Sequence, residues 1–241
     1  MFDLQSFTLT QMIVLGSALR KLGKGAASME ETANRIVRYL YDQLTSRQTH
    51  QRACVLVRLF KTHPWSQLDE RLQQSAQARL RGATAGPELK CLTLLATAGD
   101  KPEWNSRAAS KNYQAIPLPS EEAIAAAPMI SRLLSQLGLS TSTLLKPDPA
   151  LMLDIEQSNF NVFHVPEAEG SPYVPAQKGF VIPYDVKSVL GFGGLLPSGD
   201  LFAVILFSRV FIPKETAEFF KTLALSTKLA IIPFAEQRIF A

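Results

Sequence analysis

The chain has 241 residues, of which 46% are hydrophobic and 19% are charged. This length suits one large domain or a medium domain with an appendage, and the composition excludes an intrinsically disordered chain. Polar or charged residues interrupt each apolar run well before the ~20 residues that a membrane-spanning helix requires, so we expect no membrane span.

The net charge of +4 is distributed unevenly along the chain. Residues 1–111 hold 16 Lys and Arg against 9 Asp and Glu, whereas residues 112–241 hold 9 against 12. The basic residues are spread among acidic ones and form no stripe, which argues against binding to DNA or RNA. Asp3 stands where a secretory signal has basic residues, so the expected location is the cytoplasm.

Cysteine and histidine are too sparse for a disulfide framework or a metal site. Cys54 and Cys91 each lie in an apolar run, as expected for reduced core thiols. His50, His63 and His164 show no metal-ligand spacing with one another or with the cysteines. We therefore predict neither a disulfide nor a metal site.

Two helices are predicted at the N-terminus. Apolar residues repeat every three or four positions through residues 8–24, which indicates one amphipathic helix. A capping box at Ser28 begins a second helix that should run to about Leu44. We assign residues 1–46 to an N-terminal helical region for dimerisation and signalling, and residues 47–241 to a sensory domain.

Two short apolar runs, residues 53–60 and 89–97, predict strands. Residues 69–80 between them are polar with leucines at helical phase, so they predict a surface helix. Residues 101–119 show no clear period and predict a loop with room for one short helix.

Helical patterns return after Ser120, which is an N-cap residue followed by two acids. Pro128 should split this helix and Gly138 should end it. A further short helix is expected at residues 148–157.

A hairpin is the clearest supersecondary signal. Two apolar runs, residues 188–196 and 201–208, are separated by the turn sequence Pro-Ser-Gly-Asp. A strand at residues 161–165 precedes the hairpin, and a helix beginning near Pro213 follows it. Because only a short helical link separates the first two strands, we predict an α+β fold with a mostly antiparallel sheet and helices packed on it.

Residues 178–232 resemble the end of a GAF domain, the small-molecule sensing module of bacterial and eukaryotic signalling proteins. The stretch DVKSVL at residues 185–190 is similar to the family's step G-[IV]-[RK]-S-[VL]-L into a strand, with Asp185 in place of the usual glycine. The stretches GFGGLL, PSGD and LFAVILFS of residues 191–208 are similar to the next strand, the turn and the strand written G-V-L-x-L-x-S. The resemblance extends to residues 51–234, although before about Leu144 only the order of elements supports it.

The resemblance implies a sheet with helices on one face, a ligand pocket on the other face and dimerisation through terminal helices. The chain is most similar to the GAF-like regions ahead of bacterial sensor histidine kinases. The resemblance therefore implies a cytoplasmic, non-catalytic sensory or regulatory domain of a two-component system. A small ligand would act through the terminal helices of a homodimer on an output domain such as a kinase. Two alternatives are a protein–protein interaction or dimerisation module without a ligand and a GAF-type methionine sulfoxide reductase.

The sequence leaves the cofactor or ligand unknown. Both cysteines lie in predicted strands, which argues against covalent bilin, and the cyclic-nucleotide constellation N-K-F-D-E of the family is missing. Haem ligation would fall to His164 by elimination, which makes His164 a candidate ligand contact. A lone histidine is nevertheless more often an ordinary hydrogen-bonded side chain.

Five further residues are candidate ligand contacts. Trp104, Asn105 and Arg107 lie between a strand and a helix and could offer an indole face, an amide and a guanidinium to an anionic or planar ligand. In the simpler alternative, Trp104 closes the core and Arg107 is solvated. Tyr173 and Tyr184 flank a loop that the resemblance places near the pocket mouth, although edge packing would also explain them.

No catalytic residue is nominated, and we predict no enzymatic activity. Cys91 could be a redox thiol, but Lys90 would point to the opposite face of the strand, and the loop cysteines of the reductase branch are missing. Gly191, Gly193 and Gly194 lie within a predicted strand. This position favours close backbone approach or a bulge over a phosphate cradle.

Overall fold

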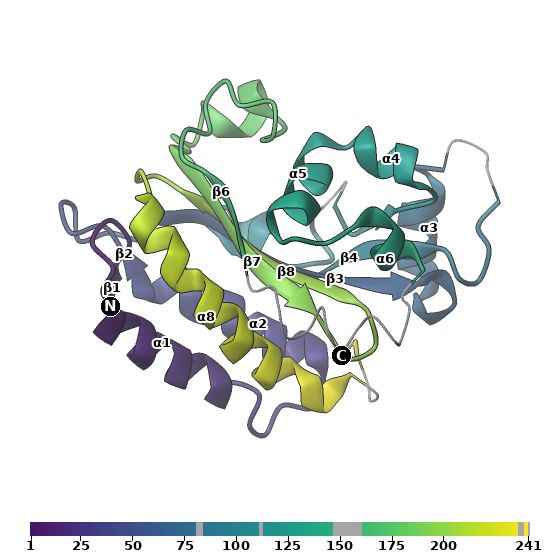
Figure 1. The fold of residues 1–241 in the computed structure, drawn as a ribbon, viewed down its shortest axis with the longest axis horizontal. Coiled ribbons are helices and arrows are strands. Elements are labelled where there is room, and N and C mark those ends of the chain that lie inside the picture. The colour runs from purple at the N-terminus through teal and green to yellow at the C-terminus, as the bar shows by residue number, and fades with distance from the viewer. Residues whose placement is uncertain (81–83, 111–112, 147–160, 236–238, 241) are drawn as a thin grey trace.

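The computed structural model of the chain describes residues 1–80, 84–110, 113–146, 161–235 and 239–240. Its centre is a six-stranded sheet in the order β5-β4-β3-β8-β7-β6, in which every neighbouring pair of strands is antiparallel. Three longer helices cover one face of the sheet, and short helices lie over the other (Figure 1). The predicted α+β class with a mostly antiparallel sheet is confirmed.

The elements of the fold are bounded as follows. The strands of the sheet are β3 (Cys54–Pro64), β4 (Lys90–Gly99), β5 (Ala115–Pro117), β6 (Val162–Val165), β7 (Ser188–Leu195) and β8 (Leu201–Ser208). The helices are α1 (Leu9–Lys21), α2 (Met29–Gln43), α3 (Glu70–Gln77), α4 (Glu121–Ala125), α5 (Pro128–Gln136), α6 (Thr141–Leu145) and α8 (Lys214–Ile231). Two short strands, β1 (Phe2–Asp3) and β2 (Leu44–Thr45), pair in parallel with each other.

Helices α2 and α8 pack against the sheet, and α1 packs against α8 on the same side of the sheet (Figure 1). At Gly16 of α1 the approach to α8 is close, because an added Cβ would lie 2.9 Å from the hydroxyl oxygen of Ser226. The buried side chains of the three helices join those of the sheet in one hydrophobic cluster. Residues 1–46 therefore pack in the same core as the sheet, and the division of the chain at residue 46 stays a prediction.

The second helix begins at the predicted cap, with one difference in detail. The Ser28 hydroxyl accepts a hydrogen bond from the backbone N–H of Glu31. The Glu31 carboxylate accepts from the backbone N–H of Ala27 at 2.7 Å, one residue before the predicted donor, while its other oxygen pairs with Arg35. Glu31 therefore holds the turn that leads into the helix as well as the helix itself.

Strand β3 lies inside the sheet, as its apolar sequence predicts, and separates two hydrophobic clusters. Val57 and Leu59 belong to the cluster under the three long helices. Leu56 and Phe60 belong to the cluster on the opposite face. This division follows from the alternation of side chains along a strand.

The predicted hairpin is confirmed. Strands β7 and β8 pair from Ser188 opposite Ser208 to Leu195 opposite Leu201. An added Cβ at Gly193 would lie 2.1 Å from the carbonyl oxygen of Phe202 in the partner strand. Close backbone approach therefore requires glycine at this position, as predicted for the glycine-rich run.

Several predicted boundaries were incomplete. The stretch 101–119 contains the strand β5 as well as a short 3-10 helix, Pro102–Asn105, and α6 was not predicted at all. Both missed elements are at most five residues long, so neither displays a readable period. Pro128 splits α4 from α5 as predicted. The helix expected at residues 148–157 lies outside the described residues.

A buried ion cluster lies at the end of the sheet where the β7–β8 turn meets β3 and β4. The Asp200 carboxylate accepts from the ammonium of Lys61 at 2.9 Å and from that of Lys90 at 2.8 Å. The Lys61 side chain is only 2% exposed. Burial alone would raise the pKa of Asp200, but the attraction of Lys61 and the hydrogen bonds from both lysines lower the pKa below its ordinary value.

No helix in the described part of the chain has both the length and the apolar content needed to cross a membrane.

Candidate functional site

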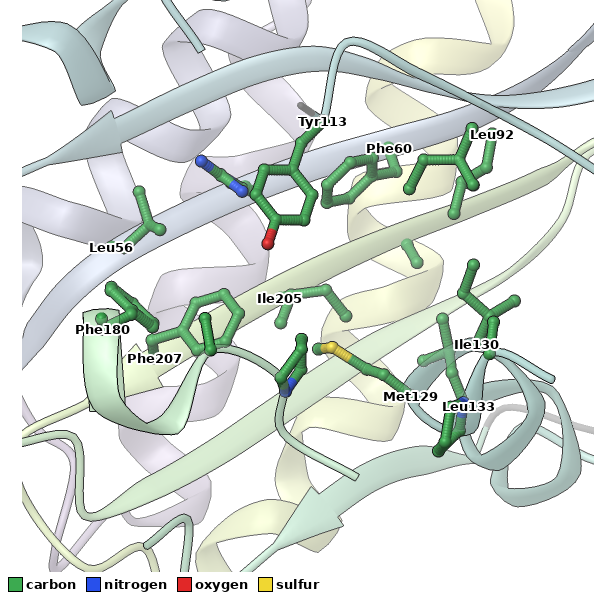
Figure 2. A pocket seen from close by; sticks show the side chains of 18 of the residues that line it. Leu56, Phe60, Leu92, Tyr113, Met129, Ile130, Leu133, Phe180, Ile205 and Phe207 are labelled. Atoms are coloured by element: carbon green, nitrogen blue, oxygen red, sulfur yellow. The ribbon is translucent and has the colours of Figure 1, made fainter. Parts of the chain in front are cut away.

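A cavity of about 450 Å³ lies on the face of the sheet opposite the three long helices. Its volume falls within the range of small-molecule binding sites. The side chains that line it come from the sheet, from α5 and from the segment 172–180, and most of them are apolar (Figure 2). They are Leu56, Arg58, Phe60, Leu92, Trp104, Tyr113, Ile116, Ala127, Pro128, Met129, Ile130, Leu133, Pro172, Pro175, Ala176, Gly179, Phe180, Ala203, Ile205 and Phe207.

The floor of the cavity is formed by alternate residues of the two central strands. Leu56 and Phe60 project from β3, and Ile205 and Phe207 project from β8 (Figure 2). Because side chains at i and i+2 share one face of a strand, this regular spacing produces a continuous apolar surface.

The opposite wall consists of α5 and the segment that precedes β7. Met129 and Leu133 of α5 face the cavity, and Phe180 lies close to Phe207 with ring centroids 5.1 Å apart (Figure 2). Phe180 belongs to a π-helical turn, Gln177–Val181. Pro128 occupies the first turn of α5, so the break that it imposes on the helix also brings α5 over the cavity.

Among the described residues that line the cavity, Arg58 alone carries a formal charge. It lies on β3 between Thr97 of β4 and Ile205 of β8 and is 8% exposed. Its Nε–H is buried and has no hydrogen-bond partner among the described residues. Burial lowers the pKa of Arg58 to about 10, so the guanidinium is still charged at neutral pH.

Tyr113 is the second polar side chain of the cavity wall. The Cζ atom of Arg58 lies 4.8 Å from the centroid of the Tyr113 ring, which is the geometry of a cation–π contact. This contact offsets part of the cost of burying the guanidinium but satisfies none of its N–H donors in the plane. The cavity thus combines a large apolar surface with one oriented cation.

Of the six predicted contact residues, Trp104 lines the cavity. Its indole packs edge-on against Phe180 at 5.5 Å and against Tyr184 at 4.8 Å between ring centroids. Tyr184 stands behind this wall, where the ammonium of Lys101 lies 4.9 Å from its ring centroid. Two of the predicted residues, Trp104 and Tyr184, therefore belong to one aromatic cluster, and Trp104 reaches the cavity.

Asn105 and Arg107 are not among the cavity-lining residues. The Asn105 side chain accepts from the backbone N–H of Gly99 and donates to the carbonyl oxygens of Gly99 and Lys101, so it fixes the turn after β4. Arg107 forms a two-point ion pair with Glu30 of α2 at 3.0 and 3.1 Å. Its guanidinium is therefore paired with α2 instead of being solvated.

His164 and Tyr173 are also absent from the cavity lining. The Nε2 atom of His164 lies 3.0 Å from the carbonyl oxygen of Ile212, and burial lowers the pKa of its imidazole. Tyr173 is 37% exposed, and the guanidinium of Arg132 lies 5.1 Å from its ring centroid. Tyr173 follows Pro172, which does line the cavity, and its place near a pocket mouth stays a prediction.

Sequence reasoning missed the most distinctive residue of the site, Arg58. Its signal was available, because a single arginine interrupts an otherwise apolar run that predicts a buried strand. Tyr113 and Phe180 gave no such signal, since each belongs to an irregular stretch whose tertiary position no local pattern reveals.

The two thiols have the surroundings of core side chains. Cys54 and Cys91 are both fully buried, and desolvation raises the pKa of each to about 12. A nucleophilic cysteine needs a lowered pKa and an exposed thiolate. Within the described ranges, no group of three His, Cys, Asp or Glu side chains is placed to hold a metal ion.

Asp185 explains one departure from the GAF-like pattern. It has a φ of 54°, in the left-handed region that favours glycine, and aspartate is among the few other residues that adopt it readily. The position where the pattern has glycine therefore has the backbone conformation that glycine permits.

Comparisons with known proteins find likeness in structure and none in sequence. No family model matches the chain, and no curated protein matches it. Among solved structures, it is similar to the GAF domain from Acinetobacter phosphoenolpyruvate-protein phosphotransferase, with 12% sequence identity and a TM-score of 0.43. The alignment covers 93% of this chain and 94% of that one.

Proposed function

We propose that the chain is a GAF-like sensory or regulatory domain that binds a small organic molecule in the cavity over the sheet. The observation that carries this proposal is the cavity itself, which has about 450 Å³ of space, an apolar lining and one buried cation. In a purely structural domain, side chains filling this face of the sheet would give greater stability, because an empty apolar cavity lacks packing contacts. The sequence resemblance of residues 178–232 to the GAF family supports the same function.

The proposed role is non-catalytic. Acid–base or nucleophilic chemistry needs a titratable group with access to a bound substrate. The cavity offers a guanidinium and a phenol among its described residues, and both suit recognition better than proton transfer. We therefore assign the cavity to binding.

The signal would pass through the sheet to the helix layer. Strand β3 contributes Leu56 and Phe60 to the cavity floor and Val57 and Leu59 to the core beneath the long helices. A ligand that favours one arrangement of the floor would shift α1, α2 and α8 by its differential affinity for that arrangement. These helices would carry the change to an output domain, such as a kinase of a bacterial two-component system.

The helix layer also presents an apolar surface that suits a homodimer. Leu9, Ile13 and Val14 of α1 are each more than half exposed, and Leu225 and Leu229 of α8 are 41% and 47% exposed. The pairs Leu9–Ile13 and Leu225–Leu229 each have the four-residue spacing that places two side chains on one helix face. A second copy packed there would cover these side chains, as the resemblance implies for terminal helices.

Native mass spectrometry of the protein purified from its host tests the proposal. We expect an excess mass that is retained under non-denaturing conditions and lost on denaturation. The variant Gly179→Phe should lose this mass, because Gly179 lines the cavity and an added Cβ there meets no atom within 4 Å. Gly86→Phe is the matched control, since its Cβ also enters open space but Gly86 is not a lining residue.

The second candidate function is an interaction or dimerisation module without a ligand, which the exposed apolar residues of α1 and α8 favour. A clean dimer with no excess mass, unchanged by a panel of metabolites, would support it over the sensor. The third alternative, a methionine sulfoxide reductase, has less support, because burial raises the pKa of both thiols far above neutral.

A further inference from the structure

We propose that the ligand of the cavity is a small organic monoanion, with a carboxylate-type group bound by Arg58 and an apolar body lying on the sheet. This inference rests on the proposed ligand-binding function and adds the chemical class of the ligand. Three features of the cavity carry it: the state of the Arg58 donors, the count of charges around them and the apolar character of the remaining wall.

The first of these features is the state of the Arg58 donors. A guanidinium has five N–H donors in a planar fork, and it recognises carboxylates through two parallel hydrogen bonds. No hydrogen bond or ion pair links Arg58 to a described residue, and its Nε–H is buried without a partner. Arginines elsewhere in the fold show the usual solution, since Arg107 has Glu30 and Arg35 has Glu31.

A buried cation without a counter-ion costs free energy of desolvation. A ligand that offsets this free energy should bind in preference to one that does not. Tyr113 contributes only the face of its ring to the guanidinium, at 4.8 Å. An anionic group would supply both the missing charge and the missing acceptors. A cationic ligand would be repelled, and a neutral apolar ligand would displace water from the Arg58 guanidinium without offering its donors an acceptor.

The number of charged side chains around the cavity indicates that the ligand carries a single negative charge. Arg58 is the one charged side chain among the described lining residues, so a dianion such as a phosphate monoester would keep an uncompensated charge in apolar surroundings. A carboxylate balances the guanidinium charge for charge and matches its fork geometry.

The remaining wall determines the body of the ligand. Phe60, Phe180 and Phe207 present aromatic rings around the space, and Ile205 and Met129 supply aliphatic surface (Figure 2). Such a wall favours an aromatic or aliphatic body without further polar groups, because each buried polar group would need its own partner. The expected ligand is therefore amphipathic, with its charge at Arg58.

A matched pair of fluorescent probes tests this class directly. Anilinonaphthalene sulfonate is a monoanion, and phenylnaphthylamine has the same aromatic body without the sulfonate. The wild-type protein should bind the anion at least about tenfold more tightly than the neutral probe, as expected for a charge-assisted hydrogen bond. Gly179→Phe should weaken both probes, which assigns the binding to the cavity.

Variants of Arg58 distinguish the effect of its charge on probe binding from the effect of its side-chain size. Arg58→Met should remove the preference for the anion and leave the neutral probe bound, whereas Arg58→Lys should keep part of the preference. Arg132→Met is the matched control, because the Arg132 guanidinium lies over the ring of Tyr173 and Arg132 is not a lining residue. That variant should keep the full preference.

These measurements distinguish a failure of the monoanion inference from a failure of the proposed ligand-binding function. Equal binding of the two probes by the wild-type protein would overturn the monoanion inference and leave the ligand-binding function standing. Loss of the preference in Arg132→Met would overturn the assignment to Arg58. Failure of both probes to bind, or binding that Gly179→Phe does not weaken, would overturn the proposed function together with the inference.

Discussion

The guanidinium of Arg58 lies over the ring of Tyr113, 4.8 Å from its centroid, and it has no hydrogen-bond partner in the described part of the chain. The first residue comes from the central strand and the second from the irregular segment before β5. Their contact places a cation inside an otherwise apolar cavity.

Replacing Arg58 by methionine should stabilise the ligand-free protein. Methionine has a comparable length and no charge, so the variant removes an unpaired buried cation while retaining apolar contact. We expect the free energy of unfolding to rise by roughly 1–2 kcal/mol in urea denaturation, a gain limited by the lost contact with Tyr113. A fall of similar size would show that Arg58 is a structural residue with partners of its own.

Replacing Asp200 should destabilise the fold more than replacing either of its lysine partners. Asp200→Asn leaves two buried ammonium groups without a counter-ion, whereas Lys61→Met leaves Asp200 paired with Lys90. We expect Asp200→Asn to cost about 3 kcal/mol or more and Lys61→Met distinctly less, measured by chemical denaturation. Equal costs for the two variants would contradict this account of the cluster.

His63 should make stability fall in mild acid. Burial, together with the charge of Lys61, lowers the pKa of His63 to about 3 from an ordinary value of 6.5. Between these two values the unfolded chain binds a proton that the folded protein does not bind, so stability decreases as the pH falls from 6.5 toward 3. Above pH 6.5 the imidazole is neutral in both states, so it does not make the stability depend on pH.

The measurement is the difference between wild type and His63→Gln in the free energy of unfolding from pH 8 to pH 4. We expect this difference to change by up to about 1.4 kcal/mol per pH unit below the ordinary histidine pKa. A constant difference across that range would mean that His63 titrates normally in the folded protein.

The sequence predicted the main architecture because its strongest patterns belong to long, buried elements. The helices α1 and α2, the strands β3 and β4 and the β7–β8 hairpin all have clear periods or caps. The site was harder to predict, because its walls come from segments far apart in the chain. Trp104, a predicted ligand contact, lines the cavity, whereas Arg107, another predicted contact, is paired with Glu30 of a distant helix. Such long-range pairing leaves no local signal.

The proposed dimer is tested by placing a charge on the exposed face of α1. Ile13 is 57% exposed, so Ile13→Glu should leave the monomer fold intact and weaken the dimer at least about tenfold. Light scattering coupled to size-exclusion chromatography would show the shift to monomer. Asn34→Glu on the exposed side of α2 is the control and should leave the dimer unchanged. A dimer that survives Ile13→Glu would place the interface elsewhere.

The central claim is that a small molecule binds inside the cavity, and methyl NMR with phenylnaphthylamine tests it most directly. The account predicts that the methyl signals of Leu56, Ile205 and Met129 move on titration, because these side chains line the cavity. Signals of the exposed Ile13 and Leu229 should move less, because these side chains belong to the helix layer and do not line the cavity. Movement confined to Ile13 and Leu229, with the cavity methyls unchanged, would contradict the claim.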